Sequence, residues 1–62
     1  MSYDIRLSTV VLAFKDDHHG ASTIRAGKRV EVIGPAEDDR FVVVSVDGEQ
    51  FRVFASDLEE RA

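Results

Sequence analysis

The sequence predicts a small all-β domain, and three observations lead to this prediction. β-Branched residues dominate the apolar segments, many of these segments alternate with polar residues at a period of two, and glycine, proline and Asp-Gly pairs separate them as in hairpins. The chain has 62 residues and no cysteine, so its core must be compact without a disulfide or a thiolate metal site. Short, evenly spaced strands favour a small barrel or sandwich.

The first predicted strand is long and runs over Ile5–Phe14. Just before and within it, Tyr3, Ile5 and Leu7 alternate with two charged residues, so we treat residues 1–9 as an N-terminal extension of this strand. A polar loop is predicted to follow at Lys15–Ala21.

The second strand is predicted over Lys28–Ile33, after a turn at Ala26-Gly27-Lys28. Val30 and Val32 share one face of this strand because side chains alternate along a strand. Gly34-Pro35 ends it, since proline cannot donate to a ladder and glycine frees the turn.

The third strand is predicted over Arg40–Val46 and is followed by Asp47-Gly48, a strong signal for a tight hairpin turn. Gln50–Phe54 is expected to return as its partner. Ser56-Asp57-Leu58 is typical of a single tight turn, and a short last segment is expected at Glu59–Ala62. Without repeats, linkers or low-complexity segments, residues 1–62 are predicted to form one domain.

Charge and hydropathy disfavour two classes of partner, nucleic acids and membranes. Eight basic and twelve acidic residues give a net charge of −4, which disfavours a nucleic-acid partner because phosphate backbones are repelled. The longest uncharged run, Leu7–Phe14, falls short of the roughly 20 residues that span a bilayer. Neither a membrane partner nor a leader peptide is predicted, so a cytoplasmic location is expected.

The order of these segments resembles an SH3 domain over residues 10–58. VVLAF at Val10–Phe14 is similar to the ALYDY strand of that family, and IRAGKRVEVI at Ile24–Ile33 to its diverging turn and second strand. DDRFVVVS at Asp38–Ser45 matches the strand that begins with a tryptophan pair, and VFASDL at Val53–Leu58 the segment written IPSNYV. The resemblance implies a five-stranded SH3-like barrel with a long first loop and a one-turn 3₁₀ helix before the last strand.

The resemblance also implies that the shelf for proline-rich peptides is lost. Leu12, Arg40 and Asp57 stand where the family has two tyrosines and a tryptophan, and only Phe14 and Phe54 keep an apolar surface. A different protein partner is therefore expected on this surface. The residues predicted to bind it correspond to the shelf or border it: Phe14, Asp16, Asp17, His18, His19, Arg40, Phe54 and Asp57.

The segment FKDDHHGAST at Phe14–Thr23 raises the question of a metal. Adjacent histidines on a loop seldom bind one ion from the same side, and the chain has two histidines and no cysteine. We interpret the segment as a solvated recognition loop, with a metal-binding or pH-sensing role as the alternative. Neither a metal nor a cofactor is expected.

Catalysis is not predicted either, because serine, histidine and aspartate occur without a strand-to-turn nucleophile motif. The ending FRVFASDLEERA is loosely similar to that of the plasmid-encoded dihydrofolate reductases, which build one pore from four barrels. Their VQIY signature is replaced here by QFRVF, so an oligomeric small-barrel enzyme is only the third alternative.

Two further features, an apolar row on the third strand and a set of acidic residues, suggest possible partners. The third strand is apolar on both faces, so the row of Val42, Val44 and Val46 is expected to be covered either by the N-terminal extension or by a second copy of the chain. An acidic set either keeps the barrel soluble or imitates nucleic acid toward a basic partner, as in antirepressor-type decoys. This set comprises Glu37, Asp38, Asp39, Asp57, Glu59 and Glu60. The first expectation is a non-enzymatic protein-binding or regulatory module, and the decoy is the runner-up.

Overall fold

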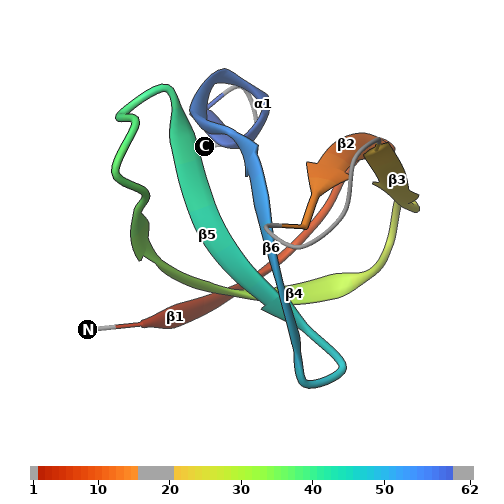
Figure 1. Cartoon of the computed structure of the whole chain (residues 1–62). Coiled ribbons are helices and arrows are strands. Elements are labelled where there is room, and N and C mark those ends of the chain that lie inside the picture. Colours follow the sequence, from red (N-terminus) through yellow and green to blue (C-terminus); the bar gives the residue numbers. More distant parts are fainter. Residues whose placement is uncertain (1, 16–20, 60–62) are drawn as a thin grey trace.

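A computed structural model describes residues 2–15 and 21–59 of the chain. They form six strands and one short helix (Figure 1). The elements are β1 (Tyr3–Arg6), β2 (Val11–Phe14), β3 (Ala21–Ile24), β4 (Arg29–Pro35), β5 (Phe41–Val46), β6 (Glu49–Phe54) and α1 (Ala55–Glu59).

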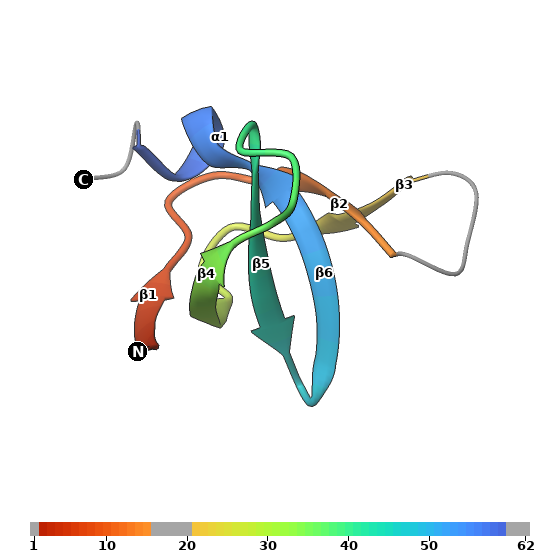
Figure 2. The same ribbon diagram turned by 60° about the vertical axis from the view of Figure 1, so that its left-hand side comes forward.

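All six strands belong to one antiparallel sheet in the order β1-β4-β5-β6-β2-β3. Within the described residues β1 and β3 are its two edges and do not pair with each other, so the sheet is not closed there. The sheet is curved, and α1 lies at the end where β5 begins and β6 finishes (Figures 1 and 2). The all-β prediction is confirmed, but the sheet has six strands rather than the five expected.

The number of strands differs for three reasons. The single strand predicted over Ile5–Phe14 is in fact two, β3 lies at Ala21–Ile24, where no strand was predicted, and the described residues contain no strand after β6. β1 pairs with β4, whereas β2 pairs with β3 and β6 on the far side of the sheet. The chain leaves β4 after Leu7, whose N–H donates to the carbonyl of Lys28 at 3.0 Å and whose carbonyl accepts from the N–H of Gly27 at 2.7 Å. Leu7 and Val11 are both buried, but the three residues between them are exposed or half-buried, so the chain passes from β1 to β2 along the surface. Both ends of this connection are apolar, so the hydrophobic pattern did not reveal the break.

The Asp47-Gly48 hairpin is confirmed. Both residues have positive φ, 52° and 86°, as a tight two-residue turn requires, and Val46 pairs with Glu49 directly across it. A helical turn also lies where the tight turn was predicted, but it is the five-residue α-helix α1 rather than a 3₁₀ helix. The predicted last strand is not found at its start, because α1 includes Glu59, and residues 60–62 lie outside the described part of the chain. No helix in the described segments is long and apolar enough to cross a membrane.

The core is entirely aliphatic. Eight side chains are buried: Leu7, Val11, Ala13, Ile24, Val30, Val32, Val44 and Val53. The four phenylalanines are all partly exposed instead. Phe51 packs against the buried cluster, whereas Phe14, Phe41 and Phe54 are not part of it. Aromatic rings usually carry much of the apolar burial in a small domain, so the partial exposure of these three rings is unusual.

The row of Val42, Val44 and Val46 faces the core. Val44 is only 1% exposed, and its two neighbours in the row pack against the buried cluster. A second copy cannot reach Val44 without opening the core. Self-association through this row stays a prediction, and the central residue of the row, Val44, is part of the core of a single chain.

Candidate functional site

Three phenylalanine rings form a cluster on the outer side of the sheet. Phe14 lies edge-on to Phe41 and to Phe54, with ring centroids 5.9 and 5.7 Å apart and interplanar angles of 85° and 88°. Phe41 and Phe54 are stacked, with centroids 4.8 Å apart and planes inclined at 29°. These are the offset and edge-to-face arrangements that aromatic quadrupoles favour, so the three rings support one another while remaining half exposed.

Strand register brings the three rings together. Phe41 pairs directly with Phe54 across β5 and β6, and Phe14 pairs with Arg52, two positions before Phe54 on β6. Residues two apart on a strand point to the same face, so Phe14, Arg52 and Phe54 share the outer face. We call Phe14, Phe41 and Phe54 the aromatic cluster.

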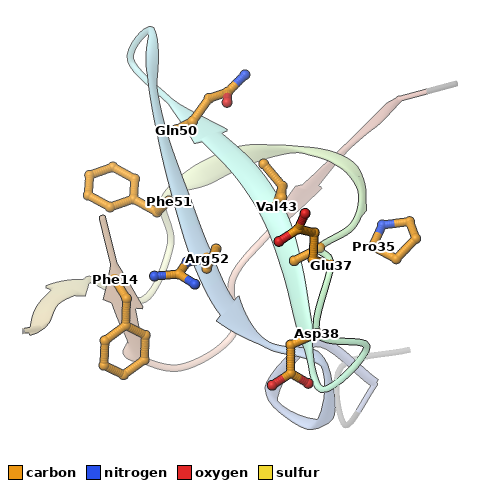
Figure 3. A pocket seen from close by; sticks show the side chains of 9 residues that line it. Phe14, Pro35, Glu37, Asp38, Val43, Gln50, Phe51 and Arg52 are labelled. Carbon is orange, nitrogen blue, oxygen red and sulfur yellow. The ribbon is translucent and has the colours of Figure 1, made fainter. Parts of the chain in front are cut away.

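A groove of about 560 Å³ lies beside this cluster and crosses β5 and β6 (Figure 3). It shares Phe14 with the aromatic cluster. Val43 lies in its middle, with Phe14, Phe51 and Arg52 to one side and Pro35 and Glu37 to the other. The full lining is Phe14, Pro35, Ala36, Glu37, Asp38, Val43, Gln50, Phe51 and Arg52. A groove lined by both apolar and polar side chains suits an extended peptide or a side chain of a partner protein.

The cation of Arg52 packs on the cluster. Its Cζ lies 5.8 Å from the ring centroid of Phe41, within the range of a cation–π contact. Arg52 thereby joins the aromatic cluster to the groove, because its side chain touches Phe41 and also lines the groove.

The rim of the groove at residues 36–41 is held in one shape by a bidentate ion pair. Arg40 Nη2 and Nε donate to Asp38 Oδ2 at 2.6 and 3.2 Å, and Nε also donates to Oδ1 at 3.0 Å. The Arg40 backbone N–H donates to the same Oδ1 at 3.0 Å, while the N–H of Phe41 donates to the Asp38 carbonyl. The hydrogen bonds from Arg40 keep the pKa of Asp38 at about 2, below its usual 3.8.

The same turn positions α1. The N–H of Ala55 donates to the Arg40 carbonyl at 2.8 Å, so the first residue of the helix is tied to the residue that holds Asp38. Asp57 lies in the first turn of α1 and is half buried. The rim and the helix therefore form one connected edge of the site.

The residues predicted to bind a partner lie at different places in the structure. Phe14 and Phe54 are brought together in the aromatic cluster. Arg40 does not line the groove; its side chain is 76% exposed and is bound to Asp38. Asp57 lies on α1 and does not line the groove either. The predictions for Asp16, Asp17, His18 and His19 fall outside the described residues.

Sequence reasoning missed Phe41, Val43, Phe51 and Arg52 as parts of the site. A signal for the first was available: a two-residue turn at Asp47-Gly48 fixes the register of its flanking strands, and counting back from it places Phe41 opposite Phe54. The resemblance drew attention to Arg40 instead, which precedes β5 and lies in the turn before it.

Within residues 2–15 and 21–59, no group of three or more His, Cys, Asp or Glu side chains is placed to hold a metal ion. Comparison of the chain with protein-family models, with curated proteins and with solved structures found no match.

Proposed function

We propose that the protein is a non-enzymatic protein-binding module with an SH3-like architecture, and that its partner docks over the aromatic cluster and the adjoining groove. The observation that carries this proposal is the position of the rings. The eight buried side chains are aliphatic and Phe51 packs against them, while the other three phenylalanines contact one another on the outer side of the sheet, with Phe14 lining the groove. Half-exposed aromatic anchors beside a groove are typical of protein-recognition surfaces.

The order of elements supports the SH3-like part of the proposal. A strand pair, β2 and β3, is followed by a turn at Gly27, then by the consecutive antiparallel strands β4, β5 and β6, and then by one helical turn. The groove lies between the end of β2 and the loop after β4, the place where the resemblance puts the ligand surface. The ring positions differ from that family, so the proposed ligand is not a proline-rich helix.

The experiment is a binding comparison of three variants with wild type. The full chain is immobilised, partners are captured from the lysate of the native host, and the bound fraction is measured for wild type, Phe54→Leu, Arg52→Gln and Tyr3→Ala. Phe54→Leu keeps apolar volume but removes the ring. Tyr3→Ala is the matched control, because Tyr3 is 61% exposed and does not line the groove.

We expect Phe54→Leu and Arg52→Gln to weaken capture of the same partner by at least about tenfold, the range of an interface hot spot, while Tyr3→Ala retains it. Circular dichroism checks that each variant is folded. Retention by all three variants would place the binding surface elsewhere.

An acidic decoy is the second candidate, and one observation favours it. Glu37, Asp38 and Asp39 are consecutive on the rim, and Arg40 is ion-paired with only the second of them. A partner that is bound by this charge is steered electrostatically and is released at modest salt, whereas a partner held by the rings is not. Elution of the captured partner in salt steps distinguishes the two functions.

A further inference from the structure

The pairing of β1 with β4 places like charges directly opposite each other. Asp4 faces Glu31 and Arg6 faces Arg29, and all four side chains are exposed on the outer face of the sheet. Directly opposite residues have Cβ atoms only ~4.5–5.5 Å apart, so like charges there are unfavourable. Among the residues that the structure describes, no ion pair joins β1 to β4.

β1 is held by its backbone pairing with β4, by the packing of Ile5 against the core and by one hydrogen bond next to the strand, which Ser2 Oγ donates to Glu31 Oε2 at 2.7 Å. The inner face of β1 contributes Tyr3, which is 61% exposed, and Ile5, which is half buried. The buried anchor of this segment, Leu7, follows β1 and is bound to Lys28 and Gly27 by its own backbone hydrogen bonds. β1 can therefore leave the sheet without removing Leu7 from the core. Figure 2 shows β1 at one side of the molecule, next to β4.

We propose that the edge of β4 now covered by β1 is a docking site for an extended segment of a partner protein, which displaces β1 and adds to the sheet in its place. The segment carries a basic residue opposite Glu31, an acidic residue opposite Arg29, and apolar residues opposite Val30 and Val32. Main-chain hydrogen bonds supply affinity in such strand addition, and the alternate side chains supply specificity.

The charges on β4 identify the occupant as a partner segment rather than a second copy. Another copy's β1 has the same sequence and brings the same like charges to Glu31 and Arg29. A segment with the opposite order turns two repulsive pairs into two attractive ones. This site lies at the β1 side of the sheet and does not depend on the groove across β5 and β6, so it goes beyond the proposed function.

The test uses two peptides of identical composition and the full chain. One spans residues 2–7 with the native sequence, and the other carries D4R and R6D, which place arginine opposite Glu31 and aspartate opposite Arg29. Each is titrated to millimolar concentration, because it competes with a tethered β1 whose effective concentration is in that range. Backbone amide NMR signals of residues 29–32 report docking, and those of residues 3–6 report displacement.

We expect the exchanged peptide to shift both sets of signals and the native peptide to bind about tenfold more weakly. In the full chain carrying D4R and R6D, β1 itself becomes complementary to β4, so the exchanged peptide should no longer bind and the midpoint of thermal unfolding should rise by roughly 5 °C. Adding R29E and E31R to that variant restores like charges and should cancel the rise.

Three outcomes would overturn the proposal. The exchanged peptide could leave residues 29–32 unperturbed, which would exclude the site. Equal binding of the two peptides would indicate that charge does not select the occupant and would favour exchange of β1 between copies. Unfolding midpoints that do not depend on charge order would show that β1 is not destabilised by its pairing.

Discussion

Phe41 and Phe54 face each other across β5 and β6 with their rings stacked 4.8 Å apart. The two residues are the first of β5 and the last of β6, so their contact closes the end of the hairpin that lies next to α1. Phe14 then leans edge-on against both rings from β2. A contact between the ends of a hairpin thus becomes the centre of the proposed binding surface.

This stacking should be measurable as a coupling energy. In a double-mutant cycle of Phe41→Ala and Phe54→Ala, we expect a favourable interaction of about 0.5–1.5 kcal/mol in the free energy of unfolding, measured with urea. Ser45→Ala and Gln50→Ala form the control cycle, because these two residues are also directly opposite on the same two strands but carry no rings. Equal coupling in the two cycles would mean that the rings contribute only as individual side chains.

Much of the fold was predictable from local signals. The Asp47-Gly48 turn and the strands that flank it follow from residue types that accept positive φ and from β-branched runs. The break of the first strand was not predictable, because Leu7 and Val11 are both apolar and nothing in the spacing shows that β1 ends before Leu7 and β2 begins at Val11. The sheet order, in which β1 joins β4 and β2 joins β6, depends on long-range packing.

The site was only partly predictable for a similar reason. Phe14 and Phe54 were selected by resemblance, while Phe41 required the register of one hairpin and Arg52 required the pairing of β6 with β2. The hairpin register could have been predicted from the sequence. The pairing of β6 with β2 could not, since it joins segments about forty residues apart, with three other strands between them in the chain.

Val43 and Val44 are neighbours on β5 with opposite surroundings. Val44 is fully buried, and Val43 lines the groove. Val44→Asp should therefore unfold the domain, since a buried unpaired charge costs more than a chain of this size can offset. Val43→Asp should leave it folded. Far-ultraviolet circular dichroism and sedimentation velocity check both variants, and a folded Val44→Asp chain of unchanged size would contradict the assignment of the core face.

Gly48 provides a test of the hairpin that sets the register. Its φ of 86° lies in the left-handed region, and a Cβ there would meet no atom within 4 Å, so the cost of Gly48→Ala is conformational rather than steric crowding. We expect a loss of about 1–2 kcal/mol in unfolding free energy, measured with urea. Asp47→Asn is the comparison, because asparagine also accepts positive φ and the substitution removes only an exposed ion pair with Lys28. Its effect should stay within about 1 kcal/mol.

The last prediction concerns pH and the rim of the groove. The hydrogen bonds from Arg40 lower the pKa of Asp38 to about 2 in the folded chain, from a usual value of 3.8. A depressed folded-state pKa means that the unfolded chain binds more protons between these values, so this contribution to stability is present above pH 3.8 and is lost as pH falls toward 2. Asp38→Asn should remove that part of the pH dependence, and high salt should reduce it in wild type because the pair is exposed. Urea unfolding between pH 2 and pH 7 measures it, with Asp39→Asn as the adjacent control. If Asp38→Asn kept the slope of wild type in this window, the ion pair with Arg40 would not be what shapes the rim.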